Sequence, residues 1–375
     1  MSIDPVIYIG ISQSFFAGLL ISTKKPFTVA NRLMATWLFL LCIELIFALL
    51  NARVIELYAF PFIAFAYGPL LYLYIRYMTN PGLKFKWINL LHSIPFIVFF
   101  IVSVIFRDVP LLEDLRYFFA PDRFISLRIV YSTAFFLSIT IYSILSFLEI
   151  RKHQRHLKDL VSFTSGVITL NWLKILSISF YIAFFVLFVL GGLNMIGDII
   201  PFDPYFVVFC FIALFSFTYS FYVIKQPEIF GTEIKFKEEE EDYEKEPGKY
   251  SKSGLRDEQA VAYLDTLISV METKKPYLNR DLSIQDLSEI TDIPRHHITQ
   301  VLNEKHGKNF FTFINEYRVK EVISRFEDPK NDNFTILAIA FDSGFNSKTT
   351  FNTIFKNLTG ITPSEYREKN TGIKG

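Results

Sequence analysis

The chain divides into a strongly apolar part and a part in which apolar and polar positions alternate at short range. The apolar part contains seven segments of roughly 18 to 26 residues, at 5–22, 28–50, 54–78, 88–106, 124–150, 172–196 and 204–224. A helix of that length crosses a bilayer core of about 30 Å. We therefore predict a seven-helix transmembrane bundle over residues 1–227.

After residue 254, apolar positions recur at helical spacing in short segments that are separated by turn residues. Thr335 can cap one short helix, Gly344 can supply a tight turn, and Ser347 can cap a second helix. The apolar stripe of that second helix follows the i, i+3, i+4, i+7 spacing, at Phe351, Ile354, Phe355 and Leu358. This order of elements predicts a helix-turn-helix.

The other face of the second helix is polar, with Lys348, Thr349, Asn352, Thr353 and Lys356. Side chains of these types hydrogen-bond to phosphates or to the edges of bases, and an α-helix fits the major groove of DNA. We therefore predict that this face binds DNA.

A similar unit lies about fifty residues upstream. Ser283 and Asp286 form the pattern of a capping box, and residues 294–306 are predicted to form the second helix of the unit. The apolar core of the first helix is predicted to be Leu287 and Ile290. Residues 310–326 between the two units are predicted to form an amphipathic spacer helix.

The pattern GF-x-S-x-x-x-F-x-x-x-FK-x-x-x-G-x-TPSEYR, at residues 344–367, resembles the AraC family of transcription regulators. The resemblance covers roughly residues 276–368 and both units. It implies two recognition helices that enter successive major-groove segments on one face of DNA, and RNA polymerase as a partner. Carried over position by position, it implies base contacts from Arg295, His296, Thr299 and Gln300 in the first unit and from Lys348, Thr349, Asn352 and Thr353 in the second.

The first unit departs from the pattern at two positions. Asp292 stands where the second unit has Gly344, and Pro294 stands where a capping serine is expected. Asp accepts a left-handed turn less readily than Gly does. We therefore expect the first unit to sit differently on DNA, or to read fewer bases, than the second.

Composition strengthens the membrane prediction, because Phe alone contributes 42 of 375 residues and hydrophobic residues reach 51%. Basic residues concentrate in alternate loops: Lys24, Lys25 and Arg32; Arg76, Lys84 and Lys86; and Arg151, Lys152, Arg155 and Lys158. Such loops are cytoplasmic by the positive-inside rule. The N-terminus is then outside, and the C-terminal domain lies in the cytoplasm of a bacterium. The first span lacks the pattern of a cleaved signal peptide.

Charge predicts three regions: residues 1–227 as the sensor domain, 228–254 as a linker and 255–375 as the DNA-binding domain. The linker is rich in acidic residues, which is typical of a solvated tether, with a docking element as the alternative. Residues 255–375 carry 16 Lys and Arg against 17 acidic residues. Near neutrality disfavours strong nonspecific binding to phosphates. Modest affinity of the monomer, and homodimers on paired DNA sites, would follow.

Two further features leave alternatives open. Val261, Leu264, Ile268 and Met271 predict a helix that either forms a dimer seam or packs onto the DNA-binding domain. Glu44 lies in the middle of the second predicted span, where an ionised carboxylate is costly. It is either a signal-sensing group or a carboxyl that is hydrogen-bonded to a neighbouring helix.

The sequence carries no motif that predicts catalysis, and neither the histidines nor Cys42 and Cys210 have the spacing of metal ligands. We therefore expect no enzyme activity, cofactor or metal. The prediction is an all-α, membrane-anchored transcription regulator whose bundle senses a small or lipophilic ligand, a property of the membrane lipid or a partner protein. The alternative is a membrane transporter or receptor whose tail is a protein-interaction module.

Overall fold

The computed structural model describes residues 4–25, 27–53, 62–80, 82–106, 121–163, 169–193, 204–225 and 255–371, together with Phe119. The predicted linker at 228–254 lies outside these residues. The chain forms two compact units, one made of Met1–Arg151 with Leu170–Ile234 and the other of Lys152–Thr169 with Lys235–Gly375. Across the described residues the regular structure is helical, apart from one isolated β-bridge between Val161 and Ser283.

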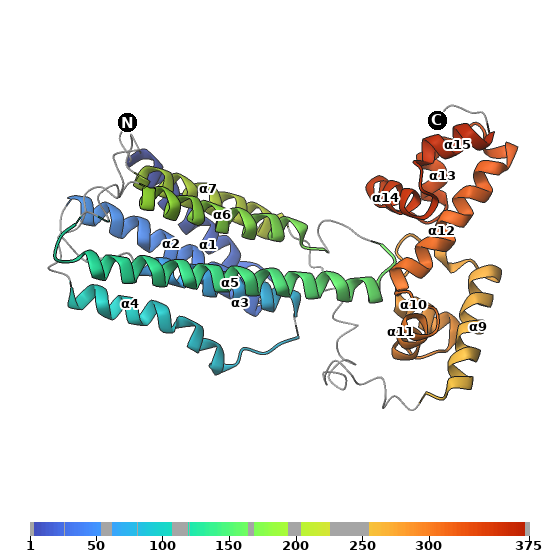
Figure 1. The fold of residues 1–375 in the computed structure, drawn as a ribbon, viewed down its shortest axis with the longest axis horizontal. Coiled ribbons are helices and arrows are strands. Elements are labelled where there is room, and N and C mark those ends of the chain that lie inside the picture. Colours follow the sequence, from blue (N-terminus) through green and yellow to red (C-terminus); the bar gives the residue numbers. More distant parts are fainter. Residues whose placement is uncertain are drawn as a thin grey trace. The chain divides into compact units, whose positions relative to one another are not determined.

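The first unit consists of long apolar helices (Figure 1). They are α1 (Asp4–Thr23), α2 (Val29–Arg53), α3 (Tyr67–Thr79), α4 (Ile94–Ile105), the larger part of α5 (Ile125–Leu160), α6 (Asn171–Leu193) and α7 (Pro204–Lys225). Among the described residues, five stretches are long and apolar enough to cross a membrane: Pro5–Thr23, Val29–Leu50, Trp87–Ile105, Ile125–Leu160 and Asn171–Leu190. The apolar stretch of α7, Val207–Val223, is shorter.

The third and the fifth predicted spans differ from the helices observed, and the fourth begins with a 3-10 helix at Trp87–Ser93. In the third, only Tyr67–Thr79 is α-helical, after a 3-10 turn at Ile63–Ala66, and residues 54–61 lie outside the described part. The fifth runs to Leu160 rather than ending at residue 150. The extension RKHQRHLKDL contains no Gly or Pro and several strong helix formers, so nothing in it ends the helix. Its basic residues, predicted to lie in a loop, are therefore helical.

The outer surface of the first unit is apolar as well as its interior. Large side chains along α4, among them Ile97, Ile101 and Ile105, are about half or more exposed, and only 11% of the Trp87–Ile105 stretch is buried. Helices that are apolar on every side are typical of membrane spans. The five long apolar helices thus indicate insertion into a membrane.

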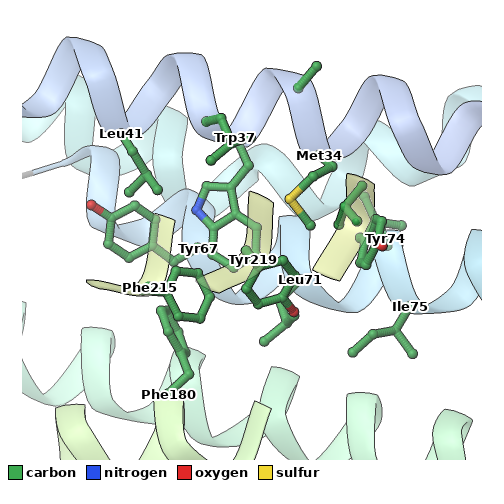
Figure 2. Close-up of a cluster of buried hydrophobic side chains, with 14 of the residues drawn as sticks. Met34, Trp37, Leu41, Tyr67, Leu71, Tyr74, Ile75, Phe180, Phe215 and Tyr219 are labelled. Atoms are coloured by element: carbon green, nitrogen blue, oxygen red, sulfur yellow. The ribbon is translucent and has the colours of Figure 1, made fainter. Parts of the chain in front are cut away.

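The interior of the first unit is built around Trp37 of α2 (Figure 2). Its ring centroid lies 5.8 Å from that of Phe180 on α6, and 5.2 Å and 5.6 Å from those of Phe215 and Tyr219 on α7. Edge-on and tilted aromatic contacts of this kind add to the packing energy of the buried area. The aromatic cluster therefore joins α2, α6 and α7.

From residue 255 to residue 371, the described part of the second unit forms seven shorter α-helices. They are α9 (Asp257–Thr273), α10 (Ile284–Thr291), α11 (Arg295–Glu304), α12 (Phe310–Glu327), α13 (Ile336–Asp342), α14 (Lys348–Thr359) and α15 (Pro363–Thr371). Helix α12 contributes to two hydrophobic clusters, with Phe313 packed among residues of α9 to α11 and Phe326 packed among residues of α13 and α14. The predicted spacer helix therefore supplies part of the core of both helix-turn-helix units.

Three apolar positions differ from the predicted cores. Ile290 and Leu358 are 37% and 45% exposed, so neither belongs to the interior that the spacing predicted. In α9, Met271 is fully buried and Leu264 packs against the cluster of the first helix-turn-helix, whereas Val261 is 49% exposed. Helix α9 therefore packs onto the DNA-binding domain, which is one of the two alternatives for this segment.

Candidate nucleic-acid interface

Helices α13 and α14 form the second helix-turn-helix, and each begins at the predicted cap. The Thr335 hydroxyl accepts a hydrogen bond from the Ala338 N–H at 3.1 Å, and the Ser347 hydroxyl accepts one from the Thr350 N–H at 3.4 Å. Gly344 in the turn has a φ of 95°. A left-handed residue costs an L-amino acid energy, so glycine suits this turn. The predicted caps and turn are confirmed.

Helix α14 has one buried face and one polar face. Phe351 and Phe355 are fully buried against α12 and α13. The predicted contact residues are all exposed, namely Lys348, Thr349, Asn352, Thr353 and Lys356. The helix carries two lysines and no acidic residue. Its outer face therefore offers cations and hydrogen-bonding groups together.

An open groove of about 490 Å³ runs between this face and the start of α15. Asn352, Thr353 and Lys356 line it from α14, and Thr362 and Ser364 line it from the other side. The polar face is thus continuous with further hydroxyl groups beyond the recognition helix.

Helices α10 and α11 form the first helix-turn-helix. The capping box is confirmed, since the Ser283 N–H donates to Asp286 Oδ2 at 2.8 Å and the Asp286 N–H donates to Ser283 Oγ at 3.2 Å. Asp292 adopts the left-handed conformation, with a φ of 55°. Pro294 stands at the N-cap of α11 without a side-chain hydrogen bond. Asp292 therefore keeps the left-handed geometry of the turn. Pro294 leaves α11 without a side-chain cap.

The predicted contact face of α11 is less exposed than that of α14. His296 is exposed, and Arg295 and Thr299 are half-buried. Gln300 is only 6% exposed, and its Nε2 donates to Glu304 Oε2 at 3.0 Å. Partial desolvation of the ring, with His297 and Arg295 nearby, lowers the pKa of His296, which favours its neutral form. Gln300 therefore does not extend into solvent as the resemblance implied.

Arg318 of α12 was not selected from the sequence and is the main polar group inside the second unit. It is 1% exposed. Its Nε donates to the Tyr277 carbonyl at 2.9 Å, and its Nη2 donates to the Asn279 carbonyl at 2.7 Å. Its burial could have been predicted from its position four residues after Ile314 and four before Val322, on the apolar side of the helix.

Arg318 also lies against the turn of the second helix-turn-helix. A Cβ atom added to Gly344 would come within 2.9 Å of Arg318 Nε and would clash with the Tyr277 carbonyl oxygen. The Arg280 Nε donates to the Phe341 carbonyl at 3.1 Å. The two helix-turn-helix units are therefore joined by an exposed hydrogen bond and by close packing at Gly344, as well as by α12.

A second buried arginine, Arg367 of α15, closes the other end of the second helix-turn-helix. It is 3% exposed, and its guanidinium donates to the carbonyls of Phe334 at 2.7 Å and Asp332 at 3.0 Å. These bonds hold α15 to the segment that precedes α13. The arginine at the end of the TPSEYR pattern therefore has a structural role.

Glu44 lies on α2 in the first unit, far in the sequence from the predicted DNA-contact residues. It is 9% exposed, and no hydrogen-bond partner for its Oε2 occurs among the described residues.

Across all the residues that the structure describes, no group of three or more His, Cys, Asp or Glu side chains is arranged to hold a metal ion.

The geometry defines a class of protein: two helix-turn-helix units share one spacer helix, and at least the second presents an exposed recognition helix. A helix-turn-helix domain family matches residues 287–369. Residues 287–369 are therefore an AraC-type helix-turn-helix domain, and the proteins that match this region are HTH-type transcriptional regulators.

Similar curated proteins match the same region. The chain is 29% identical over 109 residues to uncharacterized HTH-type transcriptional regulators of Staphylococcus aureus strains COL and MSSA476, over 29% of this chain and 14% of each relative. It is 39% identical over 70 residues to the TCP pilus virulence regulatory protein of Vibrio cholerae serotype O1, over 19% of this chain and 24% of that protein. The match thus spans a quarter or less of each relative. No solved structure matches the chain.

Proposed function

We propose that the chain is a membrane-anchored, one-component transcription regulator of bacteria. Its AraC-type domain binds promoter DNA in sequence-specific fashion, and a signal sensed in or at the membrane controls that binding. The observation that carries this proposal is the polar face of α14, where Lys348, Asn352 and Thr353 are exposed above a fully buried aromatic core. A rigid helix with such a face fits the major groove.

The two recognition helices would contribute unequally to DNA binding. Helix α14 would read bases with Lys348, Thr349, Asn352 and Thr353, and Lys356 would neutralise a phosphate. Helix α11 would contribute through Arg295, His296 and Thr299. Gln300 would contribute least, because its side chain is buried and bonded to Glu304. The near-neutral charge of residues 255–375 supports homodimers on paired sites, since one domain has few cations with which to release counterions.

The membrane part would be a bundle of seven spans, with the N-terminus outside and the C-terminus in the cytoplasm. The five long apolar helices support the insertion, and the basic residues at or between the ends of alternate predicted spans support the orientation. The signal would be a small or lipophilic ligand, a property of the membrane lipid or a partner protein. Glu44 is the candidate sensing group, because a buried carboxyl in a span is costly unless it has a role or a partner. RNA polymerase would be a further partner by analogy with the family.

The test is genome-wide crosslinking of the intact protein to DNA, with the Lys348→Ala, Thr353→Ala double variant as the control. Both substitutions lie at exposed positions and leave the buried core of α14 unchanged. We expect discrete promoter peaks that disappear in the double variant while its amount in the membrane stays the same. Absence of enrichment for the unmodified protein would overturn the proposal.

The second candidate function is a membrane transporter or receptor whose AraC-type tail binds another protein. The nearly equal numbers of basic and acidic residues in the tail favour it, because they weaken nonspecific attraction to DNA. The same crosslinking experiment separates the two functions. Peaks that persist in the double variant would sink the assignment of Lys348 and Thr353 as contact residues.

A further inference from the structure

The end of α5 and the residue pair that follows it are built into the DNA-binding unit. Leu157 is buried, and Leu160 packs against the hydrophobic cluster formed by α9 to α12. Ser162 is fully buried. We call residues 157–162 the strap. The unit that binds DNA therefore contains a piece of chain from between two predicted membrane spans, more than 120 residues before the unit's own recognition helix α11.

Ser162 makes hydrogen bonds through its N–H, its hydroxyl and its carbonyl. Its N–H and its hydroxyl both donate to the Leu282 carbonyl, at 3.2 Å and 2.6 Å. Its carbonyl accepts from Asn315 Nδ2 at 3.0 Å and from Arg318 Nη1 at 2.8 Å, and its hydroxyl accepts from Arg318 Nη2 at 2.9 Å. Beside it, Val161 forms an antiparallel bridge with Ser283. The strap is thus bonded to α12 and to the start of α10.

Arg318 depends on the strap because its charge is buried. Among the described residues no carboxylate lies within ion-pair distance of its guanidinium, which donates to carbonyl and side-chain oxygens instead. Burial lowers the pKa of Arg318 to about 10, so it remains charged at neutral pH. A buried charge without acceptors is strongly unfavourable. Loss of Ser162 would remove two of those acceptors at once.

The same arginine lies at the junction of the two helix-turn-helix units. Its Nε donates to the Tyr277 carbonyl, and both groups approach the Gly344 turn closely enough to exclude a Cβ atom. A shift of Arg318 therefore changes the contact between the first helix-turn-helix and the turn that precedes α14. The Gly344 turn leads into α14, so this contact lies where the second recognition helix meets the first helix-turn-helix.

We propose that the DNA-binding unit carries a docking site for the chain's own strap, lined by Leu282, Asn315 and Arg318, through which the membrane part sets the relative position of the two recognition helices. Helix α5 is continuous from Ile125 to Leu160, so a single helix connects the membrane part of the chain to the strap. Withdrawal of Ser162 removes two acceptors from Arg318 and loosens the junction between the two helix-turn-helix units. This inference rests on the proposed function, because it assigns the route by which that function is controlled.

The docking is tested in native membranes by a disulfide between Val161→Cys and Ser283→Cys, with Cys42→Ser and Cys210→Ser as background. Bridged antiparallel residues have Cα atoms about 4.5 to 5.5 Å apart, which suits a disulfide. A protease site inserted within residues 238–246 allows the tail to be cut from the membrane part. We expect the cut tail to stay attached under non-reducing conditions and to be released by a reductant.

The matched control pairs Lys152→Cys with Ser283→Cys, since Lys152 is exposed and lies more than two helical turns before the end of α5. Attachment of the tail in the test pair at the level of the control pair would overturn the docking. An uncut sample run in parallel identifies bonds between two chains, because these give a dimer. A dimer in place of the intrachain bond would also overturn it.

Control through the strap is tested with Leu160→Asp and with the milder Ser162→Ala, against Lys158→Asp at an exposed position of the same helix. Promoter occupancy is compared on the native operator and on one with a base pair inserted between the two major-groove segments. We expect the preference for the native spacing to fall about tenfold in Leu160→Asp, with a smaller fall in Ser162→Ala and none in the control. An unchanged preference in both strap variants would overturn the inference. Lack of occupancy in the unmodified protein would instead count against the proposed function.

Discussion

The two helix-turn-helix units share a spacer helix and a topology, yet they differ at the turn, the cap and the exposed face. The second helix-turn-helix has Gly344 in its turn and Ser347 as a cap, whereas the first helix-turn-helix has Asp292 and Pro294 at the corresponding positions. The predicted contact residues of α14 are all exposed, whereas Gln300 of α11 is buried. A shared fold therefore does not imply an equal share in DNA binding.

The largest expected change in stability concerns the aromatic core of the second helix-turn-helix. Phe351→Ala should destabilise the fold by about 3 to 5 kcal/mol, because it leaves a cavity at a fully buried site. Thermal unfolding of the purified full chain in detergent measures the change. Leu358→Ala on the same helix is the control and should change stability by less than about 0.5 kcal/mol, because Leu358 is exposed.

The turns provide the next comparison. Gly344→Ala should cost about 2 kcal/mol or more, because its φ of 95° is unfavourable for alanine and its Cβ would clash with the Tyr277 carbonyl. Asp292→Gly in the first unit should instead be neutral or slightly stabilising, because it relieves a left-handed conformation. The same unfolding measurement applies to both. Equal effects in the two turns would show that the units tolerate the same residues there.

The DNA-binding faces of α14 and α11 should differ in their effect on affinity. Lys348→Ala with Thr353→Ala should weaken operator binding by about 1 to 3 kcal/mol for each side chain that no longer reaches a base, whereas Gln300→Ala should have little effect. Titration of labelled operator DNA with the full chain in detergent, at a fixed salt concentration, measures both. A larger loss of affinity from Gln300→Ala would mean that the α11 side chain rearranges on DNA.

The helix caps should have a smaller effect. Ser347→Ala should cost about 1 kcal/mol, because the Thr350 N–H loses its acceptor. Pro294→Ala removes no side-chain cap and should cost less. The unfolding temperatures of the two variants measure the difference. A larger decrease for Pro294→Ala than for Ser347→Ala would contradict this prediction.

The smallest effect concerns pH. Partial desolvation lowers the pKa of both His296 and His297 below the ordinary value of about 6.5, so the unfolded chain binds protons more readily than the folded unit. The contribution to stability is present above pH 6.5 and is lost as the pH falls through the lowered values. Unfolding between pH 7.5 and pH 5.5, compared with a variant in which both histidines are Gln, measures it. An equal pH dependence in that variant would assign the effect to other groups.

Much of the second helix-turn-helix could be predicted, because its signals are local. Thr335, Ser347 and Gly344 each act within a few residues of their own position, and the spacing of Phe351 and Phe355 places them on one side of a helix. The exposure of Ile290 and Leu358 was not predictable in this way, because each lies on the edge of an apolar stripe. Whether an edge residue is covered depends on a neighbouring helix.

The apolar segments and the recognition helices were determined by the sequence itself, since length, periodicity and capping residues act along the chain. Tertiary structure alone decided that Gln300 is buried, that α9 packs onto the DNA-binding unit, and that Arg318 bonds to Ser162, 156 positions earlier in the sequence. The physical reason is that a buried charge must find acceptors wherever the fold brings them. No local pattern records which distant carbonyl will serve.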